Sequence, residues 1–141
     1  METLVSTFFA GLFLVIGISH AAHPEKWVKF FHSLRQLDYG ALVVIMYTLP
    51  AGLIICLLHN KWELAPSLFI TVAGWIMTLK CAVYALHDQG FYKLVRQPAK
   101  LQRNLRLTGI VMALLSLSVL GEVLGYLPAA ATSWVWSAGL H

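Results

Sequence analysis

Four long runs of apolar residues, separated by short polar segments, dominate the chain. They cover residues 4–20, 41–58, 66–86 and 107–127. Each run holds about 17–21 residues, close to the roughly 20 that a helix needs to cross a hydrocarbon core about 30 Å thick. Lipid offers no partner for open backbone groups, so each run must form an α-helix. The pattern predicts an all-α polytopic membrane protein, a four-transmembrane-helix bundle that forms one domain over residues 1–141.

A different pattern follows the first run. Trp27, Phe30, Phe31 and Leu34 recur at the spacing of one helical face, and basic residues lie between them. Such a helix lies in the membrane interface, with its apolar face toward the acyl chains and its charges toward the headgroups. We therefore expect a short interfacial amphipathic helix over residues 24–37.

Composition agrees with a membrane protein. Hydrophobic residues make up 59% of the chain and charged residues only 11%, whereas a soluble domain typically carries about 25% charged residues. The two cysteines, Cys56 and Cys81, fall near opposite ends of their predicted spans and are expected to be packing residues rather than a disulfide. Pro50 lies inside the second run, where a kink is expected.

The positive charges are unevenly distributed between the two sides of the predicted bundle. The connections 20–40 and 87–106 together hold eight Lys and Arg residues, and the other side holds only Lys61. Because loops rich in Lys and Arg stay in the cytoplasm, both basic connections should be cytoplasmic and both termini periplasmic or extracellular. No recognition module accompanies these charges, so we expect membrane lipids, and no nucleic acid, as partners.

Lys80 lies inside the third apolar run. At 1.5 Å per residue it is about 10 Å from the inner boundary near His87. Its long side chain can extend to the interface, or it can face the bundle interior, where intramembrane charges usually mark sites. Tyr47 lies at similar depth in the second run and Trp75 lies deeper in the third. We predict a ligand site lined by Lys80, Tyr47 and Trp75.

Glu122 is the only acidic residue inside an apolar run, about 22 Å from the inner boundary. That depth is too far from Lys80 for an ion pair, so we expect Glu122 to meet His59 or Lys61 at the outer mouth or to face water there. Glu122 and His59 therefore join the candidate ligand-binding residues. Gly121 and Gly125 flank Glu122 with GxxxG spacing, which suits close helix packing within one chain or in a homo-oligomer.

Four histidines should lie at the cytoplasmic face. Three of them, together with an acid, form a candidate zinc or iron site: His20, His23, His87 and Asp88. His20 and His87 alone could ligate a haem, since two helices would present them at equal depth. Histidines at helix ends also commonly cap helices or contact headgroups. Absence of a cofactor and binding of a metal or haem therefore both stay open.

Other catalytic signatures are absent. The chain has no nucleophile elbow, no glycine-rich phosphate loop and no HExxH motif. The question of enzymatic activity stays undecided, with the balance toward a non-enzymatic protein.

One longer pattern links several of these residues. His59-Asn60-x-Trp62, then Thr71-x-x-Gly74-Trp75, then Lys80 resembles a pattern of small uncharacterised bacterial four-span integral membrane proteins, written HNxW…TxxGWxxxxK. The layout is also loosely similar to DoxX-like proteins. Cys81 departs from the pattern, which has glycine there. The resemblance implies a multi-pass protein of the bacterial inner membrane and brings no known reaction.

These observations lead to one main functional hypothesis and two alternatives. The main hypothesis is a non-enzymatic inner-membrane protein that binds or organises lipid or a small amphiphile between its helices. The first alternative is a metal- or haem-binding redox component that uses the cytoplasmic histidines. The second is an oligomeric transport unit.

Overall fold

The structure, a computed structural model, describes residues 2–62, 65–87, 91, 93 and 95–125. Five helices, and no strand, occur in this part of the chain: α1 (Glu2–Ala22), α2 (Pro24–Arg35), α3 (Gly40–Leu58), α4 (Leu68–Leu86) and α6 (Pro98–Val123). The predicted all-α fold is confirmed. The predicted amphipathic helix is confirmed as α2.

Four of the helices, α1, α3, α4 and α6, are long and apolar enough to cross a membrane. The chain is therefore a multi-pass membrane protein. The main difference from the predicted spans is in α6, which begins at Pro98 rather than near Leu107. Proline lacks an N–H that the first turn of a helix would leave unpaired, so Pro98 can begin a helix that includes part of the basic connection. Residues 126 and 127 of the predicted fourth span lie outside the described residues.

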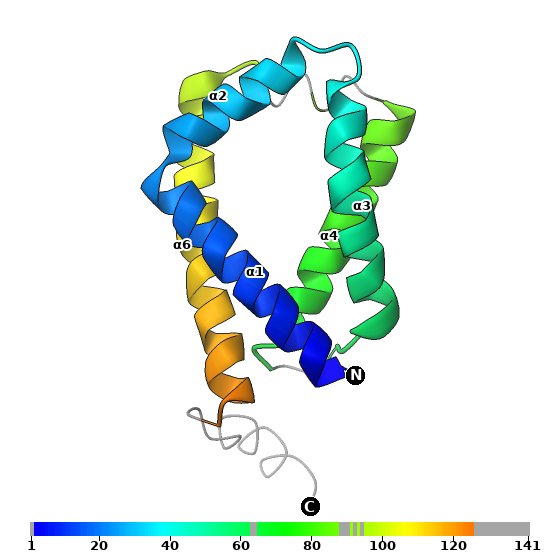
Figure 1. The fold of residues 1–141 in the computed structure, drawn as a ribbon, viewed down its shortest axis with the longest axis vertical. Helices are drawn as coiled ribbons and strands as arrows, with labels where there is room; N and C mark the ends of the chain where they lie inside the picture. The colour runs from blue at the N-terminus through cyan, green and yellow to red at the C-terminus, as the bar shows by residue number, and fades with distance from the viewer. Residues whose placement is uncertain (1, 63–64, 88–90, 92, 94, 126–141) are drawn as a thin grey trace, which may run out of the picture.

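The four long helices pack as two pairs. α1 packs mainly on α6, and α3 packs mainly on α4. The pairs approach each other at the end that holds the N-terminus and diverge toward the other end, where α2 runs across from the α1/α6 pair toward α3 (Figure 1). Neighbours within a pair are thus not always neighbours in sequence, since α1 and α6 lie at opposite ends of the described chain.

Glycines set the close approach within each pair. A Cβ added at Gly17 would lie 2.8 Å from the Gly109 carbonyl oxygen, and one added at Gly109 would lie 2.6 Å from the Gly17 oxygen. In the other pair, a Cβ at Gly52 would lie 3.1 Å from the Gly74 oxygen. Small residues at helix contacts let backbones approach, as membrane helices require. This contact pairs Gly52 of α3 with Gly74 of α4.

Two apolar clusters join the pairs. The lower cluster lies at the N-terminal end of α1, and its buried residues are Val5, Phe9, Ala10, Phe13, Ile55, Ile70 and Val119. The upper cluster lies under α2, and its buried residues are Leu34, Ala41, Tyr84, Phe91, Val95 and Leu101. These two clusters are separate. The middle of the molecule therefore lacks a continuous core between the two pairs.

Candidate ligand site between the helix pairs

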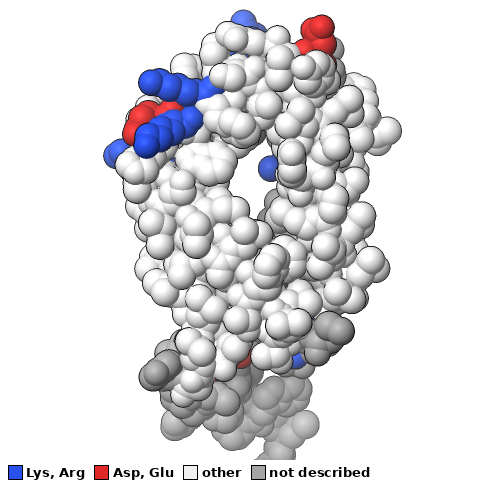
Figure 2. Space-filling view, viewed as in Figure 1, with Lys and Arg blue, Asp and Glu red and all other residues white. Residues whose placement is uncertain are grey.

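The two helix pairs leave an opening between them. Figure 2 shows that this opening passes through the molecule, with white non-charged atoms around it and one basic group at its α3/α4 edge. Lys80 is the only Lys or Arg in α3 or α4. The upper and lower clusters bound the opening at its two ends. The opening is the main candidate for a ligand site because uncharged residues surround it and a single basic group faces it.

The helical position of Lys80 agrees with this placement. Phe69, Ala73 and Met77 pack against the lower cluster, on the face of α4 that meets α1. Lys80 and Tyr84 continue that face at spacings of three and four residues, so they point toward the same side higher up. Because the pairs have diverged at that height, Lys80 meets open space rather than a neighbouring helix.

The aromatic ring beside Lys80 belongs to Tyr84. Lys80 Nζ lies 5.9 Å from the centroid of the Tyr84 ring, within the range of a cation–π contact. Tyr84 is buried, and its ring packs on Phe91 in the upper cluster. Tyr47, the partner expected from sequence, is 79% exposed on α3. The contact between Lys80 and Tyr47 expected from depth stays a prediction.

Trp75 also lies away from Lys80. Five residues separate the two along α4, which corresponds to a rotation of about 140° around the helix axis at 3.6 residues per turn. The Trp75 indole N–H donates to Asn60 Oδ1 at 3.2 Å, and the Trp62 indole N–H donates to the same oxygen at 2.8 Å. The Asn60 side chain thus connects two tryptophans at the lower end of the α3/α4 pair.

His59 lies beside this group and is 1% exposed. Its Nε2 lies 3.2 Å from the Ser67 carbonyl oxygen and its Nδ1 lies 3.2 Å from Ser6 Oγ. The carbonyl can only accept, so Nε2 donates, and in a neutral imidazole Nδ1 accepts from the Ser6 hydroxyl. Thr71 Oγ1 donates to the His59 carbonyl and accepts from the Lys61 backbone N–H.

These contacts give a physical reason for most of the HNxW…TxxGW pattern. The hydrogen bonds of His59, Asn60 and Thr71 connect the α3–α4 loop to both helices, and the bond to Ser6 extends them to α1. We call the group formed by His59, Asn60, Trp62, Thr71 and Trp75 the lower hydrogen-bonded cluster. Its polar atoms bond to one another and to nearby Ser6 and Ser67. The cluster positions the loop and lies apart from the opening.

Glu122 lies in the last turn of α6, and its Oε2 is buried with no hydrogen-bond partner in the described part of the chain. The imidazole nitrogens of His59 bond to Ser6 and Ser67 rather than to Glu122. The expected contact with Lys61 stays a prediction. Gly125, the second glycine of the GxxxG spacing, follows the end of α6 with φ +72° and has no atom within 4 Å of an added Cβ. The packing role of Gly121 stays a prediction.

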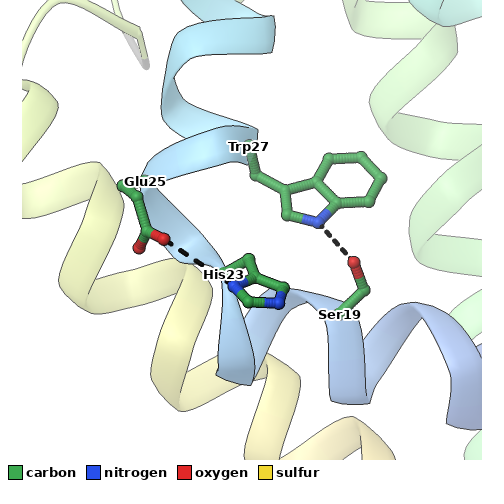
Figure 3. Close-up of polar contacts among 4 residues, drawn as sticks. All are labelled: Ser19, His23, Glu25 and Trp27. Carbon is green, nitrogen blue, oxygen red and sulfur yellow. Dashed lines mark hydrogen bonds and ion pairs between the residues drawn. The ribbon is translucent and has the colours of Figure 1, made fainter.

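The upper end of α1 holds a group of aromatic and polar contacts that sequence analysis did not foresee. The Trp27 indole N–H donates to Ser19 Oγ at 3.0 Å (Figure 3). The Trp27 ring also packs edge-on against His20, with 4.3 Å between ring centroids. Both His20 ring nitrogens are buried without a hydrogen-bond partner among the described residues. Trp27 therefore fixes α2 against the end of α1.

The candidate metal ligands are placed as follows. Both His20 nitrogens are buried, so a metal or a haem iron could reach them only if neighbouring groups moved. His23 Nδ1 lies 3.8 Å from Glu25 Oε1 (Figure 3), and His87 Nδ1 lies 2.9 Å from the Leu86 carbonyl oxygen. Asp88 lies outside the described residues. Within the described ranges, no three His, Cys, Asp or Glu side chains gather closely enough to hold a metal ion.

The comparisons with known proteins assign no function, so a functional proposal depends on the geometry described above. No protein-family model, no curated protein and no solved structure matches the chain.

Proposed function

We propose that the protein binds an acidic amphiphile in the opening between its two helix pairs and has no catalytic role. One observation carries the proposal: Lys80 continues the face of α4 on which Met77 packs toward the lower cluster, and it has the Tyr84 ring as its neighbour. No carboxylate of the described residues forms an ion pair with it. A lone ammonium group among apolar side chains is costly, and an anionic headgroup would offset that cost.

The shape of the opening supports an amphiphile rather than a small polar ligand. Space between apolar helices inside a bilayer does not stay empty, because side chains that line an empty space lose dispersion contacts. An acyl chain suits such walls, and Lys80 suits a carboxylate or phosphate at its end. Lys80 lies six residues before Leu86, about 9 Å below the end of α4. A single-chain acid can place its headgroup at that depth more easily than a two-chain phospholipid.

We also propose that α2 and the first turns of α6 face the cytoplasm of a bacterial inner membrane. The basic groups on the visible face gather at the α2 end, away from the N-terminus (Figure 2). This distribution supports the orientation expected from the charge asymmetry. The resemblance to small bacterial four-span proteins supports the same compartment, and we propose that the shared pattern mainly maintains the lower hydrogen-bonded cluster.

The metal or haem hypothesis has less support. The His20 nitrogens are covered, and the described residues form no metal-binding group.

A lipid-retention experiment tests the main proposal. The purified protein is loaded in detergent with oleate or with the uncharged oleyl alcohol, and bound molecules are counted by native mass spectrometry. We expect the native protein to retain oleate in preference to the alcohol. Lys80→Met should lower the affinity for oleate about tenfold or more, in line with the loss of a charge-assisted contact of about 1.5–3 kcal/mol.

Two variants control this experiment. Lys80→Arg keeps the charge and should retain oleate. Lys29→Met removes one positive charge from the exposed surface of α2 and should leave binding unchanged. If Lys80→Met and Lys29→Met behave alike, Lys80 only extends to the interface and the proposed site is wrong.

A further inference from the structure

A second cavity lies at the start of α6, away from the opening. It has a volume of about 180 Å³, and its lining residues are Lys93, Gln97, Lys100, Leu101 and Asn104. Lys93 precedes α6, Gln97 is its N-cap residue, and Lys100 and Asn104 lie in its first two turns. The cavity therefore forms between Lys93, which precedes α6, and the first turns of the helix that begins at Pro98.

The floor of this cavity is fixed by a buried core. Leu101 is 6% exposed and belongs to the upper cluster together with Phe91 and Val95, each 2% exposed. Phe91 packs on Tyr84 of α4, with 5.9 Å between ring centroids. The backbone positions of Lys93 and Lys100 are thus set by packing on both sides of the cavity.

The chemistry of the walls suits an anion. The two lysines contribute ammonium groups, and the Gln97 and Asn104 amides add further donors. None of the lining residues is acidic, and neither lysine forms an ion pair with any described residue. Arg96, Arg103 and Arg106 add positive charge to the same short stretch of chain.

The depth of the cavity distinguishes a lipid from a soluble anion. The predicted apolar run begins at Leu107, so Asn104 and Lys100 lie about 4 and 10 Å beyond the hydrocarbon boundary along the helix. Headgroups occupy a layer of roughly 5–8 Å on each side of the membrane. Asn104 therefore lies within the headgroup layer and Lys100 just beyond it, and the long lysine side chain can extend back to the lipid phosphates.

We propose that this cavity is a specific site for the phosphate of an anionic phospholipid in the leaflet beside α2. The site is independent of the opening and of Lys80. Phosphate oxygens would accept from Lys93 and Lys100, and the amides of Gln97 and Asn104 would orient the headgroup. One acyl chain would then follow the outer surface of α6, where Leu107, Ile110 and Leu114 are exposed.

The test uses the full-length protein in nanodiscs of phosphatidylcholine that contain a small fraction of phosphatidylglycerol. Native mass spectrometry counts the phosphatidylglycerol molecules that stay bound. We expect one tightly bound molecule, and we expect Lys93→Gln/Lys100→Gln to weaken its binding about 30-fold, because each basic residue near the surface contributes about 1 kcal/mol. Lys93→Arg/Lys100→Arg keeps both charges and should keep the lipid.

The matched control is Lys26→Gln/Lys29→Gln, which removes the same charge from α2 at the same end of the molecule. An equal loss in this variant would show diffuse attraction to the membrane surface and overturn the proposal. Competition by millimolar inorganic phosphate to the same extent as by phosphatidylglycerol would indicate a soluble anion instead and would also overturn it. Oleate retention by the Lys93→Gln/Lys100→Gln variant, with Lys80 intact, verifies folding and keeps this result separate from the proposal on the opening.

Discussion

His59 illustrates how a single polar residue is used at the lower end of the molecule. It was a candidate ligand residue by sequence, yet it is nearly inaccessible, and both ring nitrogens have neighbours within the protein. Its contacts join α1, the α3–α4 loop and the segment before α4. The imidazole therefore holds three parts of the chain together.

The first prediction concerns this residue. His59→Ala removes the two hydrogen bonds of the buried imidazole, to Ser6 and to Ser67, and each such bond typically contributes about 0.5–1.5 kcal/mol. We expect the free energy of unfolding to fall by about 1–3 kcal/mol in SDS titrations followed by circular dichroism. His32→Ala, at an exposed position of α2, serves as control and should change stability little. A similar small change for His59→Ala would contradict the structural role.

Lys80 and Tyr84 show the limit of reasoning from depth. Sequence placed Lys80 and Tyr47 at the same height, and helix rise makes that estimate sound. Contact also requires the right direction around each helix axis, and the ring beside Lys80 belongs to Tyr84 of its own helix. The depth of a residue in the membrane follows from counting residues along its helix. The direction of its side chain relative to other helices depends on which helices pack together.

At the scale of helices, each pair depends on a glycine contact. Gly17 and Gly109 place the backbones of α1 and α6 so close that neither position has room for a Cβ. The pairing is non-local, since the two helices are separated by most of the chain. The packing of α1 on α6 should therefore be weakened by one added methyl group at this contact.

The second prediction follows from this contact. In Gly109→Ala, the new methyl group would meet the Gly17 oxygen and the Ala21 nitrogen at 2.6 and 2.7 Å. We expect a loss of about 1–3 kcal/mol of stability from overpacking, measured by the same SDS titration. Gly11→Ala, where an added Cβ meets nothing within 4 Å, should be neutral or stabilise α1 by about 0.5–1 kcal/mol. A stable Gly109→Ala variant would show that α1 and α6 do not approach this closely.

At the scale of the whole molecule, the two pairs form a frame around an opening and meet in the lower cluster. Phe13 of α1 and Phe69 of α4 make one of the contacts across the junction, with ring centroids 5.9 Å apart. The opening lies between this junction and the upper cluster, because the two clusters are separate.

The third prediction tests the junction. Phe13→Ala removes a ring that is 5% exposed, and burial of this extent makes a loss of about 3–5 kcal/mol typical. Because Phe13 contacts Phe69 across the junction, we expect the α1/α6 pair and the α3/α4 pair to separate first, with oleate retention lost before helix content. Phe8→Ala, at a 63% exposed position of the same helix, is the control. Simultaneous loss of retention and helicity would contradict a two-part architecture.

The fourth prediction tests the orientation of the molecule. In a variant without Cys56 and Cys81, single cysteines replace Lys29, Lys100 or Trp62. An impermeant thiol reagent added from the periplasm should label the cysteine at position 62 and leave those at positions 29 and 100 unlabelled. The reverse labelling pattern would show the opposite orientation of the protein and would place both proposed sites in the opposite leaflets.

The sequence by itself determined the class of protein, the four spans and the amphipathic helix, because apolar run length and helical spacing depend only on local residue order. It also identified Lys80 as an unusual charge. Only the tertiary structure decided that α1 pairs with α6, that an opening separates the pairs, and that Trp75 bonds to Asn60 rather than facing Lys80. The reason is physical: pairing and facing are set by contacts between residues far apart in the chain, such as Gly17 with Gly109, which local spacing cannot specify.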